Sequence, residues 1–417
     1  MEYNICKLAN GLRVIHLPSQ SQVLYCGYQF AAGTRDELPG EEGLAHFCEH
    51  VTFKGTAHRS AFQILNCMER VGGDLNAFTN KESTVYYVAV LREHLTTAVS
   101  LLTDMVFHAT YPDSEIEKEK EIICDEIESY HDTPSELIYD EIENLVFAGH
   151  PLGHNILGTA ERVRSFGRED AVRFTRNFYR PDNAVFFAYG DISFRRLVQL
   201  LCKAGQTQVL SLGDTPATSV VRPSSMANWS FPSSEGRQIV CERHTHQAHV
   251  MVASRAYSAY DDRRLPLFLL NNLVGGPGMN SKLNVSLRER HGLVYTVDSS
   301  VVNYGDTGIW SVYFGCDYKD VNRCLRLVRR ELDKLMQRPL RDAQLAAAKR
   351  QLKGQLGVSF DNRENFAISF GKSFLHYGKE RDIEQLYASI DRITVQEMWE
   401  VAQEIFAPAR CYTLIYK

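Results

Sequence analysis

Apolar and polar residues alternate in some parts of this chain and recur at a helical period in others, and the two patterns occur twice in the same order. Residues 83–106, STVYYVAVLREHLTTAVSLLTDMV, begin as an alternating strand and continue through a charged turn into an amphipathic helix. Residues 308–332, GIWSVYFGCDYKDVNRCLRLVRREL, repeat that order about 225 positions later. The repeat predicts two α/β halves related by internal duplication.

The two halves are separated by residues 206–236, which are rich in Ser, Thr, Pro and Gly and lack helical periodicity. This composition indicates a linker. We therefore expect an N-terminal domain over residues 1–205 and a homologous C-terminal domain over residues 237–417. The length of 417 residues agrees with this division, because it is too long for one ordinary core.

The stretch GLAHFCEHVTF, residues 43–53, carries two histidines and a glutamate within five positions. On a helix, His46, Glu49 and His50 share one face, because positions i, i+3 and i+4 lie on the same side. Two imidazoles one turn apart can hold a zinc ion, and the carboxylate between them can polarise a metal-bound water. This is the H-x-x-E-H order of some zinc peptidases. A surface helix with a chance triplet is the competing interpretation.

A catalytic zinc ion needs a third protein ligand, and the acidic residues 113–132, DSEIEKEKEIICDEIESYHD, are the best donor region. On a helical wheel the apolar stripe consists of Ile116, Ile123, Ile127 and Tyr130. Glu119 and Glu126 fall on or beside this stripe. The solvated face holds Glu117, Glu121 and Glu128. A carboxylate that points toward a core needs a partner, which can be a metal, a buried arginine or a backbone cap. The wheel does not decide which of the two inward glutamates would be the ligand.

These residues make the chain resemble the zinc peptidases related to pitrilysin, insulin-degrading enzyme and the mitochondrial processing peptidase, as a short bacterial-type member of two domains. That family combines an inverted HxxEH helix with a glutamate some 75 residues onward, and 75 residues separate His50 from Glu126. The resemblance implies that His46, His50 and Glu126 bind one Zn²⁺ per chain. It also implies that Glu49 is the general base and that Glu119 is a supporting catalytic carboxylate.

The fold class that we expect is α+β (α/β). It would comprise two homologous sandwich domains from internal duplication, each a mostly antiparallel sheet packed with helices.

Two further segments are similar to substrate-binding segments of that family. Residues 71–87, VGGDLNAFTNKESTVYY, are similar to a family segment whose strand edge pairs with the backbone of the substrate. In this chain Asn76, Ala77 and Phe78 occupy the matching positions. In residues 275–297, GGPGMNSKLNVSLRERHGLVYTV, Arg288 and Tyr295 match a pair that binds substrate and helps to stabilise the tetrahedral intermediate. Without the resemblance, Arg288 would be a surface arginine on a helix that stops at the following glycine. The second-half counterpart of the zinc helix, LPLFLLNNLVGG, contains no histidine, so we expect no metal there.

The resemblance implies a zinc-dependent endopeptidase that hydrolyses peptides or unfolded polypeptides, held in extended form inside a dimeric chamber. The chain has half the length of the long family members, so we expect a homodimer in which Arg288 and Tyr295 complete the active site in trans. The alternative is a non-proteolytic structural or substrate-presenting subunit of the same fold. The complete set of metal-centre residues favours the enzyme.

Composition and net charge favour a globular protein over a membrane-spanning or nucleic-acid-binding one. Apolar residues make up 44% and charged residues 23% of the chain, which is typical of soluble globular proteins. The net charge of −5 gives no reason to expect nucleic acid or an anionic membrane as a partner. No apolar run approaches the roughly 18 residues that span a bilayer. The first residues show no targeting pattern, and the ten cysteines form no CxxC pair, so we expect a cytoplasmic protein.

Overall fold

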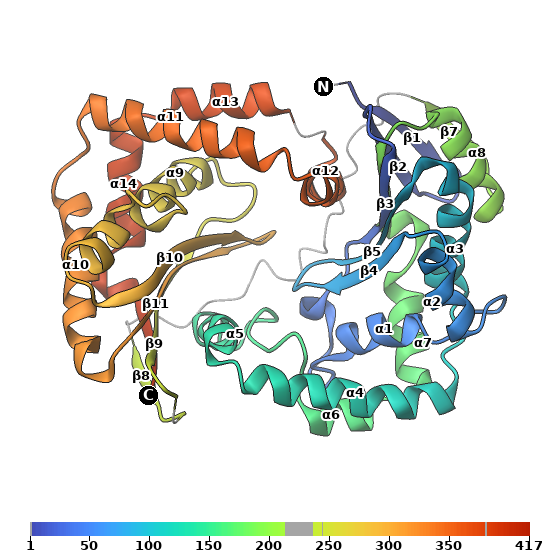
Figure 1. Cartoon of the computed structure of the whole chain (residues 1–417), viewed down its shortest axis with the longest axis horizontal. Coiled ribbons are helices and arrows are strands. Elements are labelled where there is room, and N and C mark those ends of the chain that lie inside the picture. The colour runs from blue at the N-terminus through green and yellow to red at the C-terminus, as the bar shows by residue number, and fades with distance from the viewer. Residues whose placement is uncertain (1, 213–236, 244, 380–381) are drawn as a thin grey trace. The chain divides into compact units, whose positions relative to one another are not determined.

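The computed structural model describes residues 2–212, 237–243, 245–379 and 382–417. They fall into two compact units (Figure 1). Unit 1 lies within Met1–Glu128, Asn155–Asn228 and Ser359–Asp382, and unit 2 lies within Ser129–His154, Trp229–Val358 and Ile383–Lys417. Each unit consists of helices packed on one mostly antiparallel sheet, which confirms the expected fold class.

Unit 1 is built on a seven-stranded sheet with the strand order β4-β5-β3-β6-β2-β1-β7. The strands are β1 (Asn4–Leu8), β2 (Arg13–Pro18), β3 (Val23–Phe30), β4 (Asp74–Thr79), β5 (Thr84–Leu91), β6 (Ala184–Gly190) and β7 (Val209–Leu212). The pair β2 and β6 is parallel, and the other neighbours are antiparallel. Among the described strands β4 pairs with β5 alone, so one edge of β4 stays open.

Within the described residues, seven helices share one hydrophobic core with this sheet. They are α1 (Leu44–Thr52), α2 (Ala61–Glu69), α3 (Leu95–His108), α4 (Asp113–His131), α6 (Ala160–Ser165), α7 (Arg168–Phe178) and α8 (Phe194–Ala204). The core between helices and sheet is rich in aromatic residues. Tyr28 meets Phe107 and Phe186 edge to face, at ring-centroid distances of 5.2 and 4.9 Å. Such pairs add to the stabilisation that burial of the rings provides.

Unit 2 repeats the plan with a five-stranded sheet of order β10-β11-β9-β12-β8. The strands are β8 (Gln238–Cys241), β9 (Ala248–Ala256), β10 (Val294–Asn303), β11 (Gly308–Cys316) and β12 (Tyr412–Tyr416). The helices on one face are α9 (Arg264–Gly275), α10 (Val321–Gln337), α11 (Asp342–Ser359), α13 (Ile383–Arg392) and α14 (Val395–Ile405). The repeated pattern is confirmed, because residues 83–106 form β5 and α3 while residues 308–332 form β11 and α10.

Two helices are exchanged between the halves of the sequence. Helix α5 (Pro134–Val146) lies in unit 2, and helix α12 (Arg363–Tyr377) lies in unit 1. The side chain of Arg255 on β9 donates two hydrogen bonds to the carbonyl of Val146, at 3.0 and 2.8 Å. Phe370 of α12 packs on Phe187 of β6, with ring centroids 6.3 Å apart. Side chains alternate along a strand, so Phe187 points away from the face on which its neighbour Phe186 packs. Each exchanged helix thus covers the second face of a sheet.

The expected domain ranges therefore differ from the compact units at residues 129–154 and 359–382. The physical reason is that each sheet has two apolar faces, and the other helices of its own half cover one of them. The expected linker, residues 206–236, also includes a strand of the unit 1 sheet, because Val209–Leu212 forms β7 and pairs with β1. Its remaining residues, 213–236, lie outside the described residues.

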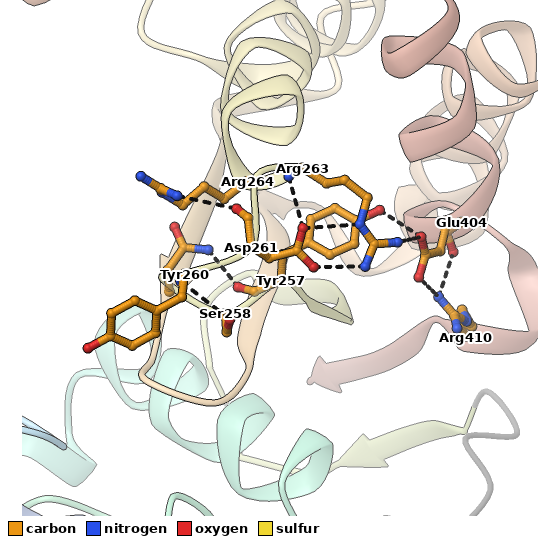
Figure 2. A network of polar contacts seen from close by, with 9 residues as sticks. Tyr257, Ser258, Tyr260, Asp261, Arg263, Arg264, Glu404 and Arg410 are labelled. Atoms are coloured by element: carbon orange, nitrogen blue, oxygen red, sulfur yellow. Dashed lines mark hydrogen bonds and ion pairs between the residues drawn. The ribbon is translucent and has the colours of Figure 1, made fainter. Parts of the chain in front are cut away.

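A polar network holds the connection between β9 and α9 in unit 2 (Figure 2). Arg263 donates hydrogen bonds to Asp261 at 2.7 Å and to Glu404 at 3.0 Å, and its guanidinium lies 4.3 Å from the ring centre of Tyr257. Tyr257 and Arg410 donate to Glu404 at 2.7 and 3.0 Å. The network ties the start of α9, which is the counterpart of α1 in the repeat, to α14.

None of the helices in the described part of the chain combines the length and apolar character needed to cross a membrane.

Candidate metal centre

Contacts of Gly43 and Glu37 hold the first turn of helix α1, which carries His46, Glu49 and His50. Its first turn is entered through Gly43, whose φ of +98° favours glycine. A Cβ atom at Gly43 would also lie only 2.7 Å from the carbonyl oxygen of Leu157. The carboxylate of Glu37 accepts hydrogen bonds from the backbone N–H groups of Gly43 at 3.1 Å and Ala45 at 2.7 Å. These bonds satisfy donors that a helix start leaves free.

His46, His50 and Glu126, the three ligands that the family resemblance implies, lie together in the structure. The Nε2 atoms of His46 and His50 lie 3.8 and 3.3 Å from the two carboxylate oxygens of Glu126. One ligand atom from each residue can be chosen so that all lie within 4.8 Å of one another. Two ligands of a tetrahedral zinc ion, each ~2.0–2.1 Å from the metal, lie roughly 3.3 Å apart. The donor set therefore fits zinc in number, type and spacing.

The two histidines differ in their electrostatic surroundings. Burial, together with the charge of His50, lowers the pKa of His46 to about 4. Burial alone would lower the pKa of His50 as well, but hydrogen bonds to Glu119 and Glu126 raise it to about 9. The hydrogen bond to His50 lowers the pKa of Glu126 against the opposing effect of burial. Without a metal ion the cluster therefore holds an anionic Glu126, a neutral His46 and a protonated His50 at neutral pH, and His50 would release its proton when it binds a metal.

Glu119 lies behind His50. Its Oε1 accepts a hydrogen bond from Nδ1 of His50 at 2.9 Å, and its Oε2 lies 2.6 Å from Nζ of Lys54. Burial would raise the pKa of Glu119, but these two partners lower it below its ordinary value. The geometry separates the two glutamates of α4: the side chain of Glu119 is 6% exposed, whereas that of Glu126 is 44% exposed, more than its place beside the apolar stripe predicts. Glu126 faces the Nε2 atoms, whereas Glu119 holds the ring of His50 from the opposite nitrogen.

Glu49 lies on the same inner face of α1 and is 8% exposed. Its Oε2 accepts a hydrogen bond of 2.5 Å from the hydroxyl of Thr79, the last residue of β4. Burial raises the pKa of Glu49, and the hydrogen bond from Thr79 partly opposes that effect. A buried carboxylate of raised pKa beside a metal-ligand set is suited to accept and return a proton.

Two supporting residues of this centre were missing from the sequence-based set. Lys54 follows His50 by four positions on the helical period, so its place beside the motif carried a signal. Thr79 lies directly after the predicted substrate-binding residues, but nothing in a strand pattern indicates that its hydroxyl reaches α1.

Asn76, Ala77 and Phe78 lie on β4, opposite Tyr87, Tyr86 and Val85 of β5. Because β4 is the last strand in the sheet order, the backbone groups of its outer edge are not used by another described strand. Asn76 donates a hydrogen bond from its side chain to Asp74 at 2.8 Å. The segment is therefore an open edge that ends at the contact between Thr79 and Glu49.

Arg288 and Tyr295 lie together in unit 2. Arg288 belongs to a π-helical turn, η5 (Asn284–Glu289), in the segment predicted as a helix that stops at Gly292. Its guanidinium carbon lies 5.7 Å from the ring centre of Tyr295. Tyr295 is the second residue of β10 and is 84% exposed. The structure thus places the cluster of His46, His50 and Glu126 within unit 1 and the pair of Arg288 and Tyr295 within unit 2.

The chain is similar to known proteins over nearly its whole length. It is 30% identical to "Uncharacterized zinc protease YmxG" of Bacillus subtilis, with 97% of this chain and 96% of that protein covered. An "Uncharacterized zinc protease" of Streptomyces coelicolor is 32% identical, with 95% and 86% covered. The "Mitochondrial-processing peptidase subunit beta" of Bos taurus is 30% identical, with 96% and 81% covered.

Solved structures share the fold. A protease from Helicobacter pylori superposes with a TM-score of 0.87 at 20% identity, covering 100% of this chain and 99% of that one. A putative M16-like peptidase from Alicyclobacillus acidocaldarius has a TM-score of 0.84 at 21% identity, with 100% and 98% covered. The sequence model of "Insulinase (Peptidase family M16)" matches residues 13–160, and that of "Peptidase M16 inactive domain" matches residues 165–352. The chain belongs to peptidase family M16.

Proposed function

We propose that this protein is a zinc-dependent endopeptidase that hydrolyses peptides or unfolded polypeptides bound in extended form. The observation that carries the proposal is the convergence of two Nε2 atoms and the carboxylate of Glu126 beside the buried Glu49. Three donors leave a fourth position of a tetrahedral ion free, as in catalytic zinc sites. The names of the zinc protease relatives support the same reaction.

The residues of the centre have separate tasks in this mechanism. His46, His50 and Glu126 would hold the zinc ion. When bound, that ion would lower the pKa of a water molecule toward ~7 and polarise the scissile carbonyl. Glu49 would accept a proton from the attacking water at a carboxylate oxygen and return it to the nitrogen of the leaving amine. Thr79 would orient Glu49 for both transfers through its hydrogen bond of 2.5 Å.

The substrate would bind along the open edge of β4. An extended peptide that adds a strand at Asn76, Ala77 and Phe78 would form backbone hydrogen bonds, which depend little on the substrate sequence. The edge ends at Thr79, whose hydroxyl contacts Glu49, so a peptide in this register would run toward the general base. This arrangement favours unfolded or extended substrates over folded ones.

We further propose a homodimeric chamber in which Arg288 and Tyr295 of one copy serve the metal centre of the other. The cationic guanidinium and the phenol would bind substrate and stabilise the developing oxyanion. The support is that one chain carries both the metal-ligating set and this exposed pair. Mixing Glu49→Gln protein with Tyr295→Phe protein tests the arrangement. Verified mixed dimers should recover activity, and inactive ones would contradict action in trans.

The central experiment combines zinc analysis with cleavage of an internally quenched peptide. Wild-type protein should contain zinc and cleave the peptide. Glu49→Gln should keep its zinc and lose at least about 100-fold in kcat/KM, the usual size of a general-base contribution. Glu121→Gln is the matched control, because it changes an exposed glutamate of α4, and it should keep full activity. Cleavage by Glu49→Gln at the wild-type rate would reject the assignment. A zinc-loaded wild type that cleaves nothing would favour a non-proteolytic subunit.

A further inference from the structure

A second cluster of metal-ligating side chains lies in unit 1 and uses none of the residues described above. It consists of His58, Asp104 and His108, whose ligand atoms lie within 4.8 Å of one another. It is the one other such group of three found in the described part of the chain. His58 and His108 are exposed, whereas the side chain of Asp104 is only 5% exposed.

The backbone holds these three residues in place. Asp104 and His108 are one turn apart on α3, so they share a face. His58 lies in the turn between α1 and α2, which is joined to the end of α3 by the bridge between Thr56 and Ala109. The backbone N–H of Ala57 also donates a hydrogen bond of 2.9 Å to the carbonyl of His108. The backbone positions of the three residues are therefore set by the fold.

The two oxygens of Asp104 face different partners. Its Oδ2 accepts hydrogen bonds from the hydroxyl of Thr56 at 2.6 Å and from the guanidinium of Arg59 at 2.5 Å. Its Oδ1 faces the Nδ1 atoms of His58 at 2.6 Å and His108 at 3.6 Å. Burial would raise the pKa of Asp104, but the hydrogen bonds from these neighbours lower it. An anionic oxygen is thus directed at two imidazole nitrogens.

These distances are near those of a zinc site. Two ligand atoms on a tetrahedral zinc ion lie roughly 3.3 Å apart, so the 3.6 Å between His108 and Asp104 already fits. The 2.6 Å between His58 and Asp104 is a hydrogen bond, and it must lengthen by under about 1 Å to admit an ion. The side chain of His58 is 64% exposed, which leaves it free to make that shift.

The surroundings leave room for the open coordination position. The cluster lines a pocket of about 660 Å³, together with Cys67 and Arg70. Two nitrogens and one carboxylate oxygen suit zinc better than the hard ions calcium and magnesium. Arg59 offsets the charge of Asp104, so we expect weaker zinc binding here than at the first centre.

We propose that His58, Asp104 and His108 form a second zinc site, in which the ion replaces the proton of the hydrogen bond between His58 and Asp104. That proton would be released to solvent, because a metal-bound imidazole nitrogen carries none. The ion would join the turn before α2 to the end of α3. The site is independent of the proposed peptidase reaction, because it shares no residue with the first centre.

Zinc stoichiometry at controlled free zinc concentration tests the proposal. Wild-type protein should bind two equivalents, with different affinities, and His58→Ala/His108→Ala protein should bind one. His46→Ala/His50→Ala protein should keep the weaker equivalent. The matched control is His131→Ala/His246→Ala, which removes two exposed histidines outside the cluster and should still bind two. Asp104→Asn is less suitable, because it disturbs the buried contacts with Thr56 and Arg59.

A stability measurement separates this site from weak binding elsewhere on the surface. In the His46→Ala/His50→Ala background, added zinc should raise the Tm, because an ion that binds only the folded state stabilises it. The same addition should leave the Tm unchanged once His58 and His108 are also replaced. A wild type that binds a single equivalent would overturn the proposal. So would a second equivalent, or a zinc-induced rise in Tm, that survives the loss of His58 and His108.

Discussion

Glu119→Gln tests how much of the zinc affinity at the proposed metal centre depends on the carboxylate that accepts a hydrogen bond from His50, a proposed ligand. The substitution keeps the shape of a side chain that is 6% exposed and removes its charge. Both neighbours of Glu119 are donors, Nδ1 of His50 at 2.9 Å and the ammonium of Lys54 at 2.6 Å. A glutamine has one acceptor oxygen and one NH₂ group, so it can satisfy only one of them well. The other donor then faces the NH₂ group.

The expected loss follows from these contacts. Replacing a hydrogen-bonded partner of a metal-bound histidine usually costs about 10- to 100-fold in metal affinity. This factor corresponds to about 1.4 to 2.7 kcal/mol, which agrees with the ~1.5–3 kcal/mol of a hydrogen bond to a charged group. Glu126→Gln should cost more than Glu119→Gln, because Glu126 is the proposed ligand and Glu119 the proposed supporting group.

The assay is a competition for zinc against a chelator of known affinity, which reports an apparent Kd for each variant. Glu121→Gln is the control on the same helix, since its side chain is exposed, and it should match the wild type. Circular dichroism checks that every variant is folded. A wild-type Kd for Glu119→Gln would refute the supporting role, and equal losses for Glu119→Gln and Glu126→Gln would refute the division between support and ligand.

Three further predictions concern other parts of unit 1. Thr79→Val should lower kcat/KM by about tenfold or more with zinc content unchanged, because the carboxylate of Glu49 loses the hydrogen bond from the Thr79 hydroxyl. Thr79→Ser keeps a hydroxyl and should retain the wild-type kcat/KM. Full activity of Thr79→Val would exclude a role of the hydroxyl in orienting Glu49. Phe370→Ala should lower the free energy of unfolding by about 3–5 kcal/mol in urea titrations, since α12 covers the second sheet face, and a loss below about 1 kcal/mol would contradict that packing. The pKa of Asp104 is lowered in the folded state, so its contribution to stability, present at neutral pH, should be lost as the pH falls below its ordinary 3.8. In a chelator-containing buffer Asp104→Asn should flatten this decline in Tm, and an unchanged profile would show that other carboxylates cause it.

Local sequence patterns determined most of the elements and part of the metal centre. The spacing of His46, Glu49 and His50 placed them on one helical face, and the structure has that helix as Leu44–Thr52. Helical periodicity also placed Glu119 and Glu126 on the side of α4 that contacts His50, but only Glu119 is buried there, because the side chain of Glu126 is 44% exposed. These inferences succeeded because they depend on contacts within one or two turns, which the geometry of a helix sets by itself.

The helical pattern left the choice between Glu119 and Glu126 open, the resemblance to the family assigned Glu126 as the ligand, and the tertiary structure supplies the distances of both glutamates to His50. A helical wheel gives the direction of a side chain but not the distance to atoms on another helix. The register of α4 against α1 decides that Glu126 reaches both Nε2 atoms while Glu119 reaches Nδ1 of His50. The contact of Thr79 with Glu49 also required the tertiary structure, because it joins a sheet edge to a helix across 30 positions of sequence.

The sequence by itself thus determined the duplicated order of elements, the zinc motif and the family to which the chain is similar. The exchange of α5 and α12, by contrast, was decided by the need of each sheet to cover a second apolar face, and a linear pattern shows only that a helix is amphipathic. The cluster of His58, Asp104 and His108 likewise depends on a turn docked against the end of α3. Contacts between distant segments are set by packing and register, so only the tertiary structure could reveal them.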